Sequence, residues 1–277
     1  NEAGDLVPSV VFDEAAIAAW LAGLAAQVAV EVRDARLAYD EIGGGLSVRE
    51  PSRSGQVLDV AGSVRRFVAA AYTDVRTAEL AVETTPPAVG SDVVERLAGR
   101  VRVLVSSSTR ITGQPPGRAV NILLAADRLD GVTLAPGGEL SLVRALGPVD
   151  EAAGYDMAQV ESGGAALGGG LEQVATSFFR AALWSGLVIV ERSHPPTRAA
   201  WVEPPIGLDA AVAPPDGDLR FRNDTDGYLI FGCRVDDVRG ALVTTVVGPP
   251  PARRVSLTGP IVEALEAPAG LPADGGV

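Results

Sequence analysis

Residues 168–179, GGGLEQVATSFF, decide how the second half of the chain folds. The three glycines are followed by a largely apolar run from Leu171 to Trp184, and Gly186 stands just beyond that run. Glycine allows the backbone a tight or left-handed turn, and an apolar run of this length is typical of a buried helix. We therefore predict a glycine turn that leads into a central helix.

The segments on either side of this helix alternate apolar and polar residues as strands do. These strand patterns lie at 101–109, 132–142, 187–193, 218–225, 228–237 and 241–248. Asp226-Gly227 and Arg239-Gly240 are turn signals that predict two successive hairpins, and a helix is expected over 118–129, ended by Gly131. The second half is predicted as an α+β unit, with an antiparallel-rich sheet packed around the central helix.

The first half is predicted as a smaller α+β unit. Its elements are a helix capped by Asp13, a hairpin over 35–50, a helix over 57–72 and a strand over 78–85. The paired prolines of TTPPAVGSD, residues 84–92, disfavour both helix and strand, so we expect a hinge near Pro86-Pro87. The predicted domains are 1–90 and 91–250, followed by a Pro/Gly/Ala-rich tail, 251–277, that frays.

Composition excludes several classes of function. The formal charge of −12 and the absence of any basic tract argue against nucleic acid or anionic membranes as partners. All 23 basic residues are arginine, which rules out chemistry by a lysine amine. The single Cys233 allows no intramolecular disulfide. The sequence has no cluster of cysteine, histidine or carboxylate residues at the short spacing of a zinc site, so we expect neither a metal nor a cofactor. We see no transmembrane segment and no signal peptide.

Several short signatures then occur in one order. They are Arg118 with Asn121 in RAVNILLAADRLDG, APGGELS at 135–141, Gly154-Tyr155, GGGLEQVATSFF, GLVIVER at 186–192, GLDAAV at 207–212 and DLRFRNDTDGYLI at 218–230. Together they resemble the VanW family of bacterial cell-envelope proteins over roughly residues 100–248. The preceding segment, with its hairpin at 35–50, resembles the peptidoglycan-binding-type domain that often stands before a VanW domain.

The resemblance implies an extracytoplasmic protein of the cell envelope, secreted or held by a membrane anchor upstream in its full-length form. Peptidoglycan or its stem peptides would be its partner. Some VanW domains are L,D-transpeptidases, in which a cysteine after the triple glycine attacks a tetrapeptide stem and forms a thioester. Amides at a helix N-terminus suit that chemistry, because they lower a thiol pKa and can stabilise an oxyanion.

This chain departs from the pattern at the reactive position. The family has a cysteine where Glu172 stands, and the family histidine corresponds to His194 only with a shift of one residue. With Asp209, these residues are the candidate catalytic group. Each residue also has a structural alternative. Glu172 could complement the helix dipole, His194 could be a structural loop residue, and Asp209 could accept hydrogen bonds from nearby backbone amides.

The candidate ligand-binding residues surround the same turn. They are Gly168, Gly169, Gly170, Gln173, Arg118 and Asn121. An arginine fork could bind a stem-peptide carboxylate, although Arg118 and Asn121 could equally tie a helix to the sheet. Cys233 lies in an apolar strand, where thiols are usually inert.

Our leading interpretation is a catalytically degenerate VanW-type domain that binds or scaffolds at peptidoglycan. Two alternatives stay open. One is an active transpeptidase-like or hydrolytic enzyme that uses Glu172 as a base, and the other is a structural protein-interaction module.

Overall fold

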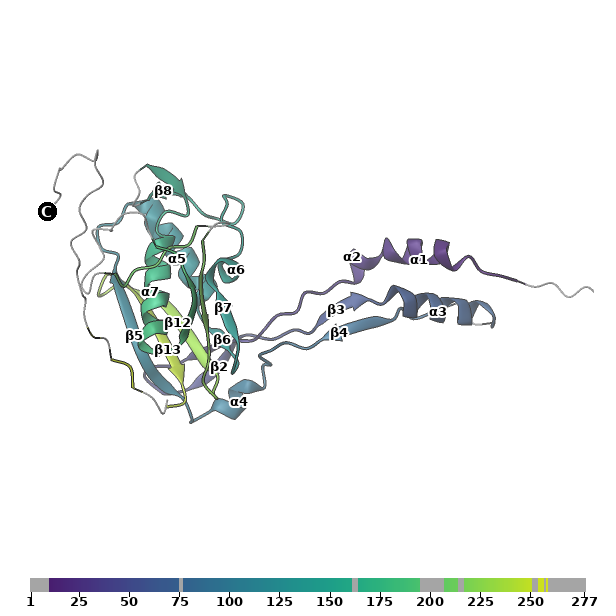
Figure 1. Cartoon of the computed structure of the whole chain (residues 1–277), viewed down its shortest axis with the longest axis horizontal. Helices are drawn as coiled ribbons and strands as arrows, with labels where there is room; N and C mark the ends of the chain where they lie inside the picture. The colour runs from purple at the N-terminus through teal and green to yellow at the C-terminus, as the bar shows by residue number, and fades with distance from the viewer. Residues whose placement is uncertain are drawn as a thin grey trace, which may run out of the picture.

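The computed structural model describes residues 10–74, 77–160, 164–194, 207–213, 217–250, 254–256 and 258. Residues 10–34 and 51–88 form a slender arm that projects from a larger body made by the other described residues (Figure 1). The predicted tail, 251–277, falls almost wholly outside the described residues.

The arm contains α1 (Glu14–Ala22), α2 (Ala25–Val28), β3 (Gly55–Leu58), α3 (Val60–Ala71) and β4 (Val82–Thr85). The helices of the body are α4 (Val93–Leu97), α5 (Pro116–Leu129), α6 (Leu142–Leu146) and α7 (Leu171–Trp184). Its strands are β1 (Arg36–Tyr39), β2 (Leu46–Glu50), β5 (Arg102–Arg110), β6 (Val132–Leu134), β7 (Glu139–Ser141), β8 (Met157–Gln159), β9 (Ala165–Leu167), β10 (Val188–Arg192), β11 (Leu219–Arg222), β12 (Leu229–Asp236) and β13 (Ala241–Gly248).

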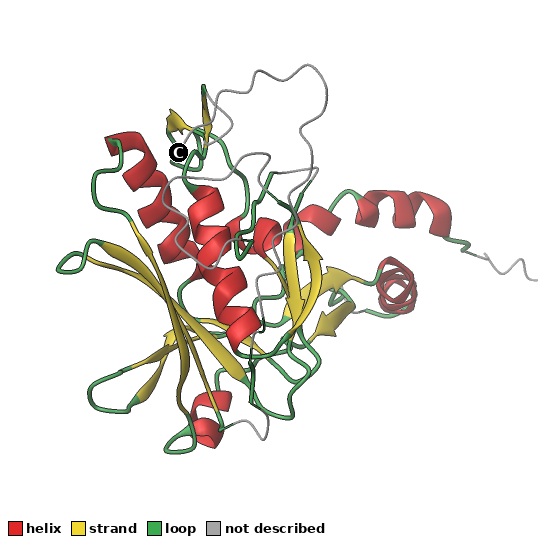
Figure 2. Cartoon of the chain, turned by 60° about the vertical axis from the view of Figure 1, so that its left-hand side comes forward, coloured by secondary structure: helices red, strands yellow, loops and turns green. Residues whose placement is uncertain are grey.

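Helix α7 is the centre of the body. It lies between a four-stranded sheet of order β5-β13-β12-β6 and a three-stranded sheet of order β10-β11-β7 (Figure 2). Every strand pair in the two sheets is antiparallel. The predicted α+β class, with an antiparallel-rich sheet around a central helix, is confirmed.

Most of helix α7 is buried in the hydrophobic core of the body. Phe178 is fully buried and stacks on Phe231 of β12, with ring centroids 5.9 Å apart. Burying a phenylalanine of this kind stabilises the fold by about 1.5–3 kcal/mol. A buried polar pair between α7 and β13 is also satisfied, because the hydroxyls of Ser177 and Thr244 lie 2.8 Å apart.

One of the two predicted hairpins is wrong. Asp226-Gly227 joins β11 to β12, yet these strands belong to different sheets. The reason is Asn223, a fully buried residue whose amide donates to the carbonyls of Leu134, Ala135 and Gly227 and so fixes the crossing between the sheets. The hairpin turning at Arg239-Gly240 is confirmed, because β12 pairs with β13 along its length.

The Pro-Gly turn within 132–142 also joins strands of different sheets, β6 and β7. In the arm, Asp13 caps α1 as predicted, accepting from the Ala16 amide at 2.9 Å. The predicted start of the next helix at residue 57 is wrong, because Asp59 caps α3 through the Gly62 amide. Residues 57 and 58 instead end strand β3, which pairs with β4.

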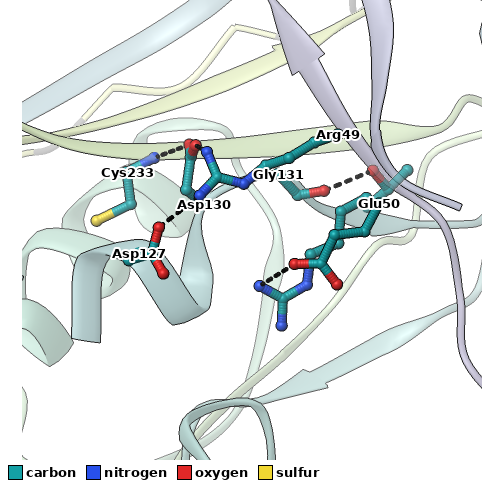
Figure 3. Close-up of polar contacts among 8 residues, drawn as sticks. Arg49, Glu50, Asp127, Asp130, Gly131 and Cys233 are labelled. Carbon is teal, nitrogen blue, oxygen red and sulfur yellow. Dashed lines mark hydrogen bonds and ion pairs between the residues drawn. The ribbon is translucent and has the colours of Figure 1, made fainter. Parts of the chain in front are cut away.

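The hairpin over 35–50 is confirmed as β1 paired with β2, but it packs on the body. Leu37 is fully buried in one cluster with Ile230 and Val247 of the four-stranded sheet. Arg49 lies between Asp127 and Asp130, with nitrogen–oxygen distances of 2.6 and 2.5 Å (Figure 3). Apolar burial and a two-carboxylate clamp therefore fix the hairpin to the body.

The chain passes between arm and body three times, through a region we call the neck, residues 30–35, 51–56 and 85–91. The Ala35 amide donates to the Val89 carbonyl at 2.9 Å, and the Val89 amide donates to Asp34. The backbone amides of Ser52 and Ser91 each donate to the hydroxyl of the other residue. The predicted linker is thus partly buried, whereas the hinge and the domain limits at 90 and 250 stay predictions.

Candidate functional site

The glycine turn is packed too closely for side chains. Gly168 and Gly170 have left-handed φ values of 74° and 111°, which non-glycine residues rarely adopt. A Cβ on Gly169 would lie 2.5 Å from the Ala158 carbonyl oxygen, and one on Gly170 would lie 3.0 Å from the Arg118 side chain. The turn is therefore pressed between the β8–β9 hairpin and α5, which accounts for all three glycines.

Asn121 and Arg118, both buried on α5, fasten this turn. The Asn121 amide donates to the carbonyls of Asp156 and Gly169 at 3.0 and 2.9 Å, and its oxygen accepts from the Asp156 amide at 2.8 Å. Arg118 donates to the Gln159 carbonyl at 3.1 Å. These bonds give both residues a positioning role, and contact with a ligand stays a prediction.

Gln173 connects the first turn of α7 to the four-stranded sheet. It is fully buried, and its amide nitrogen donates to the Arg110 carbonyl, at the end of β5, at 2.6 Å. Its amide oxygen is buried without a hydrogen-bond partner among the described residues. An orphaned buried acceptor costs roughly 1–3 kcal/mol, so this position marks a place where a donor would be favoured.

Glu172 lies half-buried in the first turn of α7. Gly170 provides no capping side chain, and the positive end of the helix dipole favours an anion here. A carboxylate at this position is consistent with the dipole-complementing interpretation, and a role as a base stays a prediction.

Asp209 is held by Arg192, a residue that we did not predict for the site. The carboxylate of Asp209 lies 3.2 Å from the guanidinium, which also donates to the carbonyls of Gly207 and Asp209. The same guanidinium lies 4.3 Å from the ring centroid of Phe179 on α7. Burial lowers the pKa of Arg192, while the charge of Asp209 opposes that shift.

His194 lies exposed at the end of β10. Ser193 beside it accepts from the Ala211 amide at 2.9 Å, and the Thr176 hydroxyl exchanges hydrogen bonds with the backbone of Ala210. These bonds bring the strand end, residues 207–213 and the first half of α7 side by side. The backbone thus gathers the segments that carry Glu172, His194 and Asp209, while the Asp209 carboxylate is engaged by Arg192.

The signal for Arg192 was its place in GLVIVER, directly before Ser193 and His194. Its importance depends on residues 207–209, which are distant in sequence, so no local pattern could reveal it. Cys233 is buried, and desolvation raises the pKa of its thiol to about 12, which makes it unreactive at neutral pH. Across the described part of the chain, we find no group of residues that could hold a metal ion and no helix able to cross a membrane.

Comparison with known proteins finds a family match over most of this arrangement. A family model described as "VanW like protein" matches residues 117–245, a range that includes α5, the glycine turn, α7 and the strands around them. This region is a VanW-like domain. The uncharacterized protein YoaR of Bacillus subtilis (strain 168) is 29% identical to the chain over 164 residues, 58% of this chain and 52% of that protein.

The chain therefore spans about half the length of the curated relative that it matches. No solved structure shows a significant match. The VanW-like match begins after the arm, the neck and β5, and nothing in the comparisons identifies the arm as a peptidoglycan-binding domain.

Proposed function

We propose that this protein is an extracytoplasmic cell-wall protein whose VanW-like domain binds or scaffolds at peptidoglycan without catalysing cysteine-dependent L,D-transpeptidation. The observation that carries the proposal is Glu172 in the first turn of α7, directly after the packed glycine turn. We infer that the glycine turn and the start of α7 correspond to the family site, where the reactive position then holds a carboxylate.

The chemistry of a carboxylate supports the degenerate interpretation. Attack by Glu172 on a peptide amide would form a mixed anhydride, which is much harder to form than a thioester and hydrolyses quickly. The donors at a helix N-terminus also favour a charged carboxylate, which lowers its strength as a base.

The ion pair of Asp209 argues in the same direction. Its carboxylate accepts from a guanidinium that is fixed by two backbone carbonyls and an aromatic ring. An acid held in this way serves to position residues 207–209. To orient His194, the Asp209 carboxylate would have to break its ion pair with Arg192.

Mass spectrometry of muropeptides incubated with the protein tests the proposal. Wild type and Glu172→Gln should leave tetrapeptide muropeptides unchanged, and both should sediment with purified peptidoglycan. Glu172→Cys tests whether the frame still supports the thiol chemistry, because the helix N-terminus favours a thiolate.

Cross-linked dimers formed by wild type and lost in Glu172→Gln would refute the degenerate interpretation in favour of an enzyme that uses Glu172. Failure of folded wild type to sediment with peptidoglycan would refute the binding role. Fractionation that placed the full-length protein in the cytosol would refute the proposed location.

A further inference from the structure

Strand β5 has an open edge in the part of the chain that the structure describes. It lies at the end of the four-stranded sheet, with β13 as its one neighbour there. The Ile111 amide donates to the Gly240 carbonyl, and antiparallel strands direct alternate residues toward and away from the partner. Ser106 and Ser108 therefore direct their amide and carbonyl groups away from β13, where another extended chain could pair with them.

A cavity of about 290 Å³ lies at the C-terminal end of this edge. It is lined by Ser106, Ser108, Thr109, Arg110, Arg180, Arg239, Ala241 and Val243. Three of these lining residues are arginines. Its volume is at the small end for ligand pockets, which suits one end of a chain.

The arginines come from three separate elements. Arg180 of α7 is held by a bond from its Nε to the Leu208 carbonyl at 2.7 Å. Arg239, in the turn before β13, lies 3.7 Å from Asp236, a long ion pair with a residue outside the cavity. Arg110 ends β5. Arginines that line one cavity favour an anion with paired oxygens, such as a carboxylate or a phosphate.

An independent observation points to the same cavity. The hydroxyl of Thr109 has no hydrogen-bond partner among the described residues, although the residue is only 5% exposed and lines the cavity. Buried hydroxyls are rarely left unpartnered in native structures. A bound polar group would satisfy it.

We propose that the edge of β5 and this cavity form a binding site for an extended peptide with a free C-terminal carboxylate. The peptide backbone pairs with Ser106 and Ser108 as an added strand, and its carboxylate lies among Arg110, Arg180 and Arg239. This inference rests on the proposed function, because it takes a peptidoglycan stem peptide as the ligand. Gln173 bonds to Arg110, so a peptide here would end beside the first turn of α7.

Calorimetric titration with a stem tetrapeptide tests the site, comparing its free acid with its C-terminal amide. Wild type should bind the acid about 10- to 100-fold more tightly, the range expected for charged hydrogen bonds. Arg110→Gln should remove this preference. Arg102→Gln is the matched control, because it removes the same charge from an exposed residue at the other end of β5.

Hydrogen exchange gives a readout that needs no variant. Saturation with the acid should slow exchange of the Ser106 and Ser108 amides. Equal binding of acid and amide, equal effects of the two arginine variants, or unchanged exchange would each overturn the inference. So would binding of inorganic phosphate without the peptide, which would mark a pocket for small anions.

Sedimentation with intact peptidoglycan separates the two proposals. If wild type sediments but the tetrapeptide does not bind, the site is wrong and the proposed function stands. If the tetrapeptide binds as described and the protein does not sediment, the site stands and the wall-binding role fails.

Discussion

Replacing Asn121 with leucine should strongly destabilise the body. The side chain is fully buried and makes three hydrogen bonds to backbone groups, namely the Asp156 amide and the carbonyls of Asp156 and Gly169. Leucine has nearly the same size but leaves all three groups unpaired. At about 1–3 kcal/mol for each, and with partial relaxation, we expect a loss of roughly 3–6 kcal/mol.

Urea and thermal unfolding measure this loss. For a protein of this size we expect the melting temperature to fall by about 6–24 °C, since 1 kcal/mol corresponds to about 2–4 °C. Leu123→Gln, on the exposed face of the same helix, is the control and should change stability by less than about 0.5 kcal/mol. A loss below about 1 kcal/mol in Asn121→Leu would show that the glycine turn does not depend on these bonds.

Three further predictions follow from the packing. Gly169→Ala, whose Cβ would meet the Ala158 carbonyl, should cost about 1–3 kcal/mol. Gly137→Ala has open space and should cost less, about 1 kcal/mol from its positive φ; the reverse order in thermal unfolding would contradict the steric argument. Arg49→Ala removes the ion pairs that join the β1–β2 hairpin to Asp127 and Asp130, so amide exchange in that hairpin should accelerate, and unchanged exchange would refute this role of Arg49. The raised pKa of Cys233 implies that the folded protein retains a proton which the unfolded chain loses above about pH 9, so stability should fall by up to about 1.4 kcal/mol per pH unit between pH 9 and 12. Cys233→Ala should show a smaller fall, and equal pH slopes would contradict the assignment.

The sequence predicted which segments of the body form helices and strands better than it predicted which strands pair in a sheet. The bounds of α7 were correct because Gly170 and Gly186, with φ values of 111° and 72°, bracket an uninterrupted apolar run. The sheet assignment of β11 and β12 failed because Asp226-Gly227 is a local signal. The bonds that decide it run from Asn223 to Leu134 and Ala135, which stand 89 and 88 positions earlier in the chain.

The same limit applies to the site. Glycines 168–170, Asn121 and Gln173 were predicted together, and the structure brings them together. Their bonds to the backbone could not be predicted, because Asn121 meets Gly169 across 48 positions and Gln173 meets Arg110 across 63. The docking of the β1–β2 hairpin depends on Arg49 and on aspartates 78 and 81 positions away, a separation at which periodicity carries no information.

The three chain crossings of the neck have a mechanical consequence. A tensile force applied to the arm is shared among three segments that are hydrogen-bonded to one another, through Asp34 and Ala35 to Val89 and through Ser52 to Ser91. Cleavage of one crossing leaves the other two intact, so a single proteolytic nick would not release the arm. A fragment beginning at residue 91 would also lose Leu37 and expose Ile230 and Val247, which the hairpin covers in the intact chain. This connection lets the chain bear load between the arm and the body while its hydrophobic core stays covered.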